Sequence, residues 1–325
     1  MNKETELIAR IEGLQVHFGS PQQPIRAVDG LDLEIESGRT LALVGESGCG
    51  KSVTAMALAR LVPEPPARYA GGRVLWQGRD VLCMSQAELR VLRGNDIAYI
   101  FQDPSASLNP VFRIGYQIGE SIRLHRPKAP VEKEVLELLE RVGMTDPHRA
   151  ARSYPHQLSG GMQQRAMIAM ALACQPRLLV ADEPTTALDV TIQAQILDLL
   201  ASLQRELGMA ILLITHNLGL VGSIAHRVNI MYAGHVVEAG ETTQVLRHPR
   251  HPYTKGLLQA VPTLQGGNER LAGMKGTVPN PIDLPSGCRF RPRCPLAQPL
   301  CQEQAPTFAR MNDAQTSRCH FWEKL

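Results

Sequence analysis

A glycine-rich octapeptide, GESGCGKS, occupies residues 45–52 and constrains the fold more than any other segment. It follows the apolar run TLALVG and precedes KSVTAMALARLV, a stretch of good helix formers that ends before PEPP. The pattern G-x-x-x-x-G-K-S between a strand and a helix is typical of a phosphate-binding loop, whose backbone N–H groups face the phosphates. In such a loop Lys51 reaches the terminal phosphates and Ser52 ligates Mg²⁺. The predicted nucleotide-binding residues here are Gly45, Glu46, Ser47, Gly48, Cys49, Gly50, Lys51, Ser52 and Val53.

The rest of the chain has the pattern of an α/β protein. Alternating apolar and polar residues over 9–44 predict strands separated by turns. The continuous apolar runs RLLVADE (177–183) and AILLIT (210–215) are typical of parallel strands covered on both faces. The segment 191–208 between them predicts a helix that ends at its glycine. Residues 110–175 read mostly helical, so we expect a helical insertion in an α/β core.

Composition and charge narrow the class of protein. The chain has 325 residues, of which 44% are hydrophobic, and this is enough for one sizeable core or two linked ones. The formal net charge of +3 is mild, and no stretch combines dense Lys and Arg with aromatic residues, so nucleic acid is not a favoured partner. No apolar run approaches the roughly 18 residues of a spanning helix, and the N-terminus is charged throughout. We therefore expect a protein kept in the cytoplasm.

The composition changes near residue 260. Beyond it the sequence becomes rich in Gly and Pro and poor in periodic apolar positions, as in a linker followed by a small irregular tail. We therefore expect two parts, 1–260 and 261–325.

Two adjacent carboxylates end the apolar strand expected at 177–183. Asp182 and Glu183 could place one carboxylate toward the magnesium shell and the next beside an attacking water. Paired acids after a strand are more often a solvated strand end or a helix cap. Their combination with the phosphate loop favours the catalytic interpretation.

Several further motifs, in order along the chain, resemble those of the ABC ATPases. LSGGMQQR (158–165) resembles the signature motif of that family, and YIFQDP contains a Q-loop glutamine, Gln102. TALD resembles the D-loop at Asp189, and LLITHNL the switch histidine, His216. The resemblance implies a P-loop NTPase (RecA-like) core of the ABC ATPase type, with an antiparallel β subdomain, a helical subdomain at about 103–170 and a Cys-rich tail.

The same resemblance implies catalytic roles. Glu183 is the expected general base for water, and Asp182 is expected to bind Mg²⁺ together with Ser52 and Gln102. His216 is expected to hold the γ-phosphate, which Gln102 senses.

ABC ATPases also share their nucleotides between two subunits. Ser159, Gly160 and Gly161 of the signature are expected to contact the ATP bound by the partner, in a head-to-tail dimer that closes on ATP. Phe18 resembles the aromatic residue that stacks on adenine, although one aromatic near a strand is nearly as often part of a core.

Longer stretches are similar to the ATPase subunits of dipeptide and oligopeptide importers, and most to the first of the two paralogous ATPases of the dipeptide permeases. FQDPSASLNPVFRIGYQI and RHPRHPYTKGLLQAVP are two of them. The resemblance implies a paralogous ATPase partner in a heterodimer, two transmembrane permeases and a secreted substrate-binding protein. It places the chain peripherally on the cytoplasmic face of a bacterial inner membrane, with a permease helix bound near PSASLNPVFRIG. The alternatives are an importer of nickel or another small solute, and a non-transport ABC ATPase acting on nucleic acid.

Four of the seven cysteines lie in the last 38 residues, with the spacing C-x5-C-x6-C-x17-C. Thiolates in a segment with little apolar content suggest a metal centre that organises it. Zinc prefers tighter cysteine pairs, whereas a [4Fe-4S] cluster tolerates wider gaps, and the family resemblance also favours the cluster. Zinc and metal-free thiols remain alternatives, and Arg289, Arg291 and Arg293 either offset thiolate charge or form a solvated surface. The four candidate ligands are Cys288, Cys294, Cys301 and Cys319.

Overall fold

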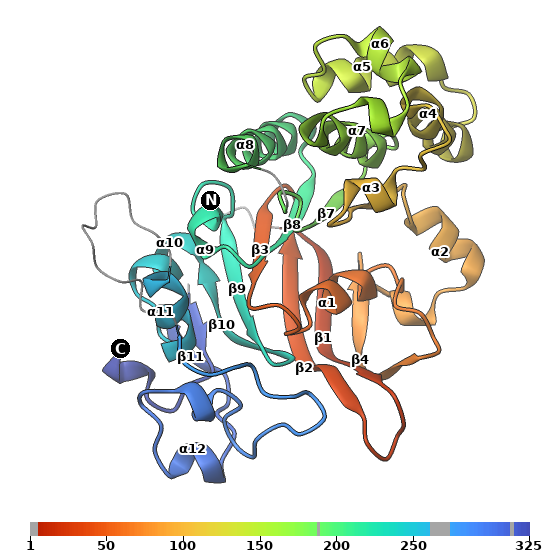
Figure 1. The fold of residues 1–325 in the computed structure, drawn as a ribbon. Helices are drawn as coiled ribbons and strands as arrows, with labels where there is room; N and C mark the ends of the chain where they lie inside the picture. The colour runs from red at the N-terminus through yellow and green to blue at the C-terminus, as the bar shows by residue number, and fades with distance from the viewer. Residues whose placement is uncertain (1–5, 187–188, 261–273, 313–314) are drawn as a thin grey trace. The chain divides into compact units, whose positions relative to one another are not determined.

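The structure is a computed structural model that describes residues 6–186, 189–260, 274–312 and 315–325 (Figure 1). The chain divides into two compact units. Unit 1 comprises the described residues of 1–8, 36–39 and 83–214, and unit 2 comprises those of 9–35, 40–82 and 215–325.

Unit 2 contains an antiparallel sheet formed by the N-terminal strands. Its strand order is β2 (Ile25–Glu36), β1 (Leu7–Phe18), β4 (Ala67–Trp76) and β5 (Arg79–Asp80). β1 and β4 pair from Ala9 opposite Trp76 to Phe18 opposite Ala67. The buried residues of β1 and β2 alternate with more exposed ones, which confirms the strands predicted over 9–44.

A second group of strands in unit 2 leads to the phosphate loop. β3 (Thr40–Val44) is buried at all five positions and runs parallel to β9 (Arg227–Tyr232). β9 pairs antiparallel with β10 (His235–Glu241), and β10 pairs with β12 (Gln315–Ser317), which also pairs with β11 (Ala309–Asn312). The tail therefore supplies strands to a sheet that the sequence pattern assigned only to the earlier part of the chain. Within the described residues, the α-helices of this unit are α1 (Lys51–Ala57), α9 (Leu218–Val221), α10 (Thr242–Arg247), α11 (Pro252–Gln259) and α12 (Leu300–Glu303).

Unit 1 holds the parallel strands predicted from continuous apolar runs. β6 (Ile97–Ile100), β7 (Leu178–Asp182) and β8 (Ala210–Thr215) pair in parallel, although the last residue of β8 belongs to unit 2. The predicted crossover helix is α8 (Val190–Leu207), and it ends at Gly208, whose φ of +65° is the left-handed conformation that glycine adopts without a Cβ penalty.

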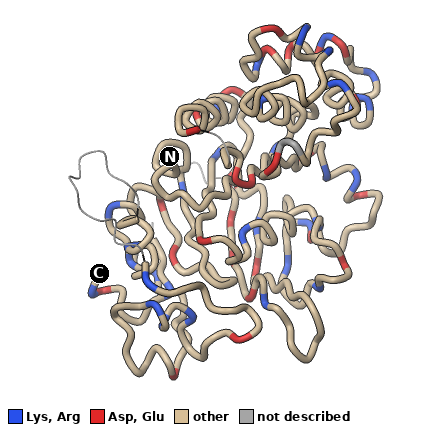
Figure 2. The backbone as a smooth tube through the Cα atoms, in the orientation of Figure 1, with Lys and Arg blue, Asp and Glu red and all other residues tan. Residues whose placement is uncertain are grey.

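Unit 1 contains helices in the segment 110–175 that the sequence predicts to be mostly helical. α4 (Ile114–His125), α5 (Val131–Arg141), α6 (Pro147–Arg152) and α7 (Gly160–Leu172) pack against one another, and α3 (Pro104–Ser107) packs against α7. Unit 1 also contains α2 (Gln86–Leu92), which begins with a capping box between Ser85 and Glu88. Figure 2 shows acidic and basic residues interspersed along α4 to α6, as on a solvated helix surface.

The helix after the phosphate loop is shorter than its sequence predicted. α1 ends at Ala57, although helix-forming residues continue to Val62. The Leu61 N–H donates to the Met56 carbonyl (2.8 Å) and the Arg60 N–H to the Ala57 carbonyl (3.0 Å). With Arg60 at a φ of +49°, these two bonds form a Schellman motif, which satisfies the last carbonyls and ends the helix.

Candidate functional site

The phosphate loop of unit 2 requires glycine at two positions for steric reasons. A Cβ on Gly45 would lie 2.2 Å from the Met231 carbonyl oxygen. A Cβ on Gly50 would lie 2.3 Å from the Ala27 carbonyl oxygen, and Gly50 also has a φ of +105°. The backbones of β9 and β2 therefore lie so close to the loop that no side chain fits at Gly45 or Gly50.

Lys51, the first residue of α1, is held inside this loop. Its side chain is 5% exposed, and its Nζ donates to the carbonyl oxygens of Gly45 (2.8 Å) and Glu46 (3.0 Å). Ser52 is exposed beside it, and Val53 is half-buried. Cys49 is only 1% exposed, and burial raises the pKa of its thiol, so it is a poorly reactive cysteine.

Phe18 and His216 are the other predicted nucleotide contacts in unit 2. Phe18 is half-buried at the end of β1, opposite Ala67 of β4. His216 is exposed directly after β8. The next residue, Asn217, caps α9 by accepting from the Gly219 N–H (3.0 Å), which ends the strand and begins a new helix just after the histidine.

Unit 1 brings two of the predicted catalytic residues together. Gln102 follows β6 and Glu183 follows β7, and these neighbouring parallel strands end at the same edge of the sheet. The Gln102 Nε2 donates to the Glu183 Oε2 over 3.2 Å. The Thr186 hydroxyl donates to the same oxygen over 2.9 Å. Thr186 was not identified from the sequence, although its place three residues after Glu183 could have indicated it.

The Glu183 backbone adopts a conformation that is rare for a side-chain-bearing residue. Its φ is +46°, and its N–H donates to the Ile214 carbonyl over 3.0 Å. A non-glycine residue in this left-handed region costs about 1–2 kcal/mol. Strain of this kind is typical of residues whose position serves a function, and here it holds the carboxylate directed toward Gln102 and Thr186.

The signature residues lie at the start of α7 in unit 1. Ser159 is the N-cap of this 13-residue helix, and its Oγ accepts from the Met162 N–H over 3.4 Å. Gly160 and Gly161 form the first turn, so its free N–H groups are available to an anion. A Cβ on Gly161 would lie 3.3 Å from Ile192 of α8, whose N-cap is the D-loop residue Asp189. The predicted D-loop residues 187–188 lie outside the described residues.

The four tail cysteines lie near one another but do not form a ligand set in this structure. The Cys288 N–H donates to the Cys301 carbonyl over 2.8 Å. Burial, together with the neighbouring thiols, raises the pKa of Cys294 and Cys319 to about 11. Within the described residues, no group of three or more His, Cys, Asp or Glu side chains is close enough to hold a metal ion.

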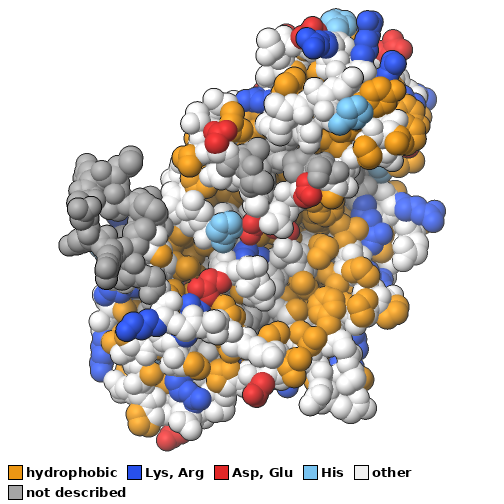
Figure 3. Space-filling view, in the orientation of Figure 1, with side chains coloured by type: hydrophobic (Ala, Val, Ile, Leu, Met, Phe, Trp, Pro, Cys, Tyr) orange, Lys and Arg blue, Asp and Glu red, His pale blue; other side chains and the backbone are white. Residues whose placement is uncertain are grey.

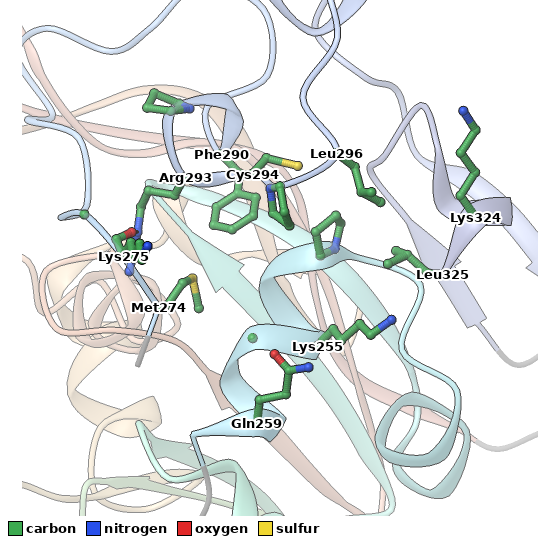
Figure 4. A pocket seen from close by; sticks show the side chains of 15 residues that line it. Lys255, Gln259, Met274, Lys275, Phe290, Arg293, Cys294, Leu296, Lys324 and Leu325 are labelled. Atoms are coloured by element: carbon green, nitrogen blue, oxygen red, sulfur yellow. The ribbon is translucent and has the colours of Figure 1, made fainter. Parts of the chain in front are cut away.

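Cys294 also lines a pocket of about 590 Å³ between α11 and the tail (Figure 4). Lys255 and Gln259 of α11 form one part of its wall, and Phe290 and Arg293 form another.

Two of the three tail arginines contact carboxylates instead of a thiolate centre or solvent. Arg289 pairs with Asp29, and Arg293 pairs with Glu46 of the phosphate loop. Their side chains are 13% and 4% exposed. Arg291 is half-buried, and its Nη1 donates to the Ser286 carbonyl over 3.3 Å.

A phosphate loop, a strand-end carboxylate beside a glutamine and a capped S-G-G helix together define a P-loop ATPase of the ABC type. Comparisons with known proteins agree. Residues 28–186 match the ABC transporter family model, and residues 237–301 match the family "Oligopeptide/dipeptide transporter, C-terminal region". The chain belongs to the ABC transporter ATPases, in the group of the peptide import ATP-binding proteins.

The relatives match almost end to end. A putative peptide import ATP-binding protein of Brucella ovis is 48% identical over 98% of both chains. The dipeptide transport ATP-binding protein DppD of Escherichia coli is 46% identical over 97% of this chain and 96% of its own.

Solved structures show the same fold. An ATP-binding cassette solved as a dimer in a post-hydrolysis state with ADP and phosphate is 26% identical, with a TM-score of 0.64 over 72% of this chain and 98% of its own. The protein cbiO1 of Clostridium perfringens is 26% identical, with a TM-score of 0.65 over 74% of this chain and 91% of its own. No helix within the described residues has both the length and the apolar character to cross a membrane.

Proposed function

We propose that this chain is the ATPase subunit of a bacterial ABC importer and hydrolyses ATP to power the uptake of di- or oligopeptides. The observation that carries the catalytic part is the strained Glu183, whose carboxylate accepts from Gln102 at the end of neighbouring strands. The names of the Brucella and Escherichia relatives, which match from end to end, support the peptide cargo.

The catalytic roles follow from the chemistry of each side chain. Lys51 binds the terminal phosphates, and Ser52, Asp182 and Gln102 are the residues that would hold Mg²⁺, which offsets the charge of the phosphates. Glu183 takes the proton of the attacking water. His216 holds the γ-phosphate, and Phe18 stacks on the base. In this proposal the chain has two functional parts. Residues 1–260 form the nucleotide-binding domain, with a helical subdomain at about 103–170, and residues 261–325 form the C-terminal extension.

The exposed S-G-G turn needs a nucleotide from another subunit. Ser159, Gly160 and Gly161 supply a hydroxyl and helix N–H groups to the ATP of a paralogous ATPase, in a dimer closed by ATP and opened by its loss. A similar solved cassette is described as dimeric with ADP and phosphate, which supports this arrangement.

Apolar side chains at the surface of unit 1 support a membrane partner. Figure 3 shows such side chains over the helical part of the molecule. Phe101, Val111, Phe112 and Tyr116 are 43–70% exposed, and the Phe112 and Tyr116 rings stack with centroids 5.0 Å apart. We assign this surface to the short cytoplasmic helix of one of two permeases, at the inner membrane of a system fed by a secreted binding protein.

A metal centre on Cys288, Cys294, Cys301 and Cys319 stays part of the proposal, with a [4Fe-4S] cluster ahead of zinc. The proximity of the four thiols supports it, whereas their spacing in this structure does not meet that of a ligand set. Iron, acid-labile sulfide and zinc content per chain, on protein purified without oxygen, tests it. About four irons and four sulfides support the cluster, and one zinc without sulfide supports a zinc clip.

Reconstitution tests the function as a whole. The chain is reconstituted in vesicles with the two permeases and the paralogous ATPase. ATP hydrolysis is then measured with a binding protein that is empty, loaded with peptide or loaded with nickel. Stimulation by the peptide-loaded protein is expected. Stimulation by nickel, or by DNA or ribosomes without the permeases, would support one of the alternatives instead.

A further inference from the structure

An arginine of the Cys-rich tail reaches into the phosphate loop, 247 residues away in the sequence. The Arg293 Nη1 donates to the Glu46 Oε2 over 2.6 Å, and its Nη2 donates to the Glu46 Oε1 over 2.9 Å. This two-bond pairing is the strongest arrangement between a guanidinium and a carboxylate. The Arg293 side chain is 4% exposed and that of Glu46 is 30% exposed, so the pair is largely shielded from solvent.

Arg293 is fixed in place by further contacts in unit 2. Its Nε donates to the carbonyl of Lys275, which lies beside it (Figure 4), over 3.1 Å. Its guanidinium carbon lies 5.8 Å from the centre of the Tyr232 ring. Arg293 closes the 3-10 turn Arg291–Arg293, directly before Cys294. The position of the guanidinium is thus set by the fold of the tail.

Glu46 is held by contacts with three residues, two of which belong to the C-terminal part of the chain. Its carboxylate binds Arg293, and its N–H donates to the Tyr253 hydroxyl over 2.9 Å. Its carbonyl accepts from the Nζ of Lys51 over 3.0 Å. Tyr253 is itself fully buried, and its ring packs against Tyr232 with centroids 4.7 Å apart.

The charge of Glu46 explains why such a partner is needed. A carboxylate inside a phosphate loop repels the polyphosphate that the loop binds, and this repulsion is strong where solvent is partly excluded. The guanidinium of Arg293 neutralises that carboxylate.

We propose that Arg293 is a positioning residue for the nucleotide and that it acts through Glu46, so that the fold of the Cys-rich tail sets the nucleotide affinity of the phosphate loop. This inference rests on nucleotide binding by the loop, but it adds a residue that none of the loop motifs contains. Arg293 affects binding and not the chemical step, because Glu46 is not among the groups that act on the water or the γ-phosphate.

The test uses the full chain and compares Arg293→Ala with the double variant Glu46→Gln/Arg293→Ala. The dissociation constant of MgADP is measured by calorimetry, with thermal midpoints alongside. We expect Arg293→Ala to weaken binding roughly tenfold, because it leaves an unpaired carboxylate in the loop. The double variant should return to within about threefold of the wild type, since that carboxylate is then neutral.

Two further variants and one assay separate this role from simple loss of structure. Arg291→Ala, on the same turn but with its guanidinium bonded to the Ser286 carbonyl instead of the phosphate loop, should bind as the wild type does. Arg293→Lys should fall between the wild type and Arg293→Ala, because lysine keeps the charge but not the two-bond geometry. In the reconstituted complex, Arg293→Ala should raise the KM for ATP about tenfold and leave kcat within about twofold.

Wild-type affinity in Arg293→Ala would overturn the proposal, as would a double variant that binds no better than Arg293→Ala. If Arg293→Ala does not fold, Arg293→Lys decides, because lysine keeps the positive charge but cannot form the two-bond pair with Glu46. It should bind MgADP more weakly than the wild type, and wild-type affinity would overturn the proposal. A wild-type chain that binds no nucleotide would instead contradict the proposed function itself.

Discussion

The phosphate loop and the Cys-rich tail of unit 2 reach their positions by different means. The backbone path of the loop is set by steric contact, since the Met231 and Ala27 carbonyls leave no space for a side chain at Gly45 or Gly50. The tail is held by contacts with residues far away in the sequence, such as the Arg293 pair with Glu46 and the packing of Phe290 in the core. A motif can therefore reveal the loop, whereas only the folded chain reveals what the tail does.

The largest expected effect tests the loop side of this comparison. Gly50→Ala places a Cβ against the Ala27 carbonyl and requires alanine at a φ of +105°. Overpacking of about 1–3 kcal/mol and a backbone cost of about 1–2 kcal/mol should together weaken nucleotide binding by up to about a thousandfold. A titration with fluorescent ATP measures this.

A glycine in an open turn provides the control. Gly78→Ala has a φ of +78° but would have no neighbour within 4 Å of the new Cβ. It should lower the free energy of unfolding by about 1–2 kcal/mol and leave nucleotide affinity intact. Equal affinity in the two variants would mean that the loop tolerates a side chain.

The second prediction tests the tail side. Phe290 is 2% exposed, and its ring lies 5.2 Å from that of Tyr232 and 5.5 Å from that of Tyr253. Phe290→Ala should lower the free energy of unfolding by about 3–4 kcal/mol, because the cavity lies in the core that the tail shares with β9 and α11. Urea denaturation measures the change.

Ile282→Ala is the matched control, because Ile282 belongs to the same tail and is 53% exposed. It should change the free energy of unfolding by less than about 0.5 kcal/mol. A Phe290→Ala variant as stable as this control would show that the tail is a separate body, as its composition suggested.

Much of the fold could be predicted because it depends on sequence patterns within short segments. The buried strands β7 and β8, the helix that ends at Gly208 and the loop all follow from apolar runs and glycines that are adjacent in the sequence. The strands β11 and β12 could not be predicted, because each is only three or four residues long and is stabilised by its neighbours.

The candidate site divides in the same way. Gln102 and Glu183 were identified separately, and their contact follows from the parallel pairing of β6 and β7. The partners of Arg289 and Arg293 lie 260 and 247 residues away, so no spacing rule could have indicated them. Thr186 begins the TALD motif, but its contact with Glu183 was not predicted, because a hydroxyl beside a carboxylate is common in turns.

The third prediction concerns a variant in which both the loop and the tail are intact and only the proposed catalytic base is removed. Glu183→Gln keeps the shape of the side chain but removes the base, so turnover in the reconstituted complex should fall at least about a hundredfold. The affinity for ATP should be retained, and the dimer should accumulate in its closed form. Steady-state hydrolysis and gel filtration with ATP measure the two effects, and undiminished turnover would contradict the role of Glu183 as base.

The fourth and smallest expected effect is on the pH dependence of stability. It concerns an ionisable group at the place where the tail strand β12 pairs with β10. Glu238 of β10 lies fully buried opposite Ser317 of β12. Its Oε1 accepts from the Arg250 N–H (2.6 Å) and from the Gln315 Nε2 (2.7 Å). Burial, only partly opposed by such hydrogen bonds, raises the pKa of this carboxyl from 4.5 to about 6.

A carboxyl whose pKa is raised in the folded state stabilises the fold below its unfolded pKa, and this contribution is lost as the pH rises through its folded pKa. As the pH rises from about 4.5 to about 6, the free energy of unfolding of the wild type should thus fall by about 2 kcal/mol. The Glu238→Gln variant should not show this decrease. Urea denaturation at pH 5 and pH 7.5 should show the variant gaining relative to the wild type at the higher pH. Glu303→Gln, at an exposed position of α12, should show no such change. A pH-independent difference for Glu238→Gln would mean that the ionisation of Glu238 does not affect how firmly the tail strand is attached.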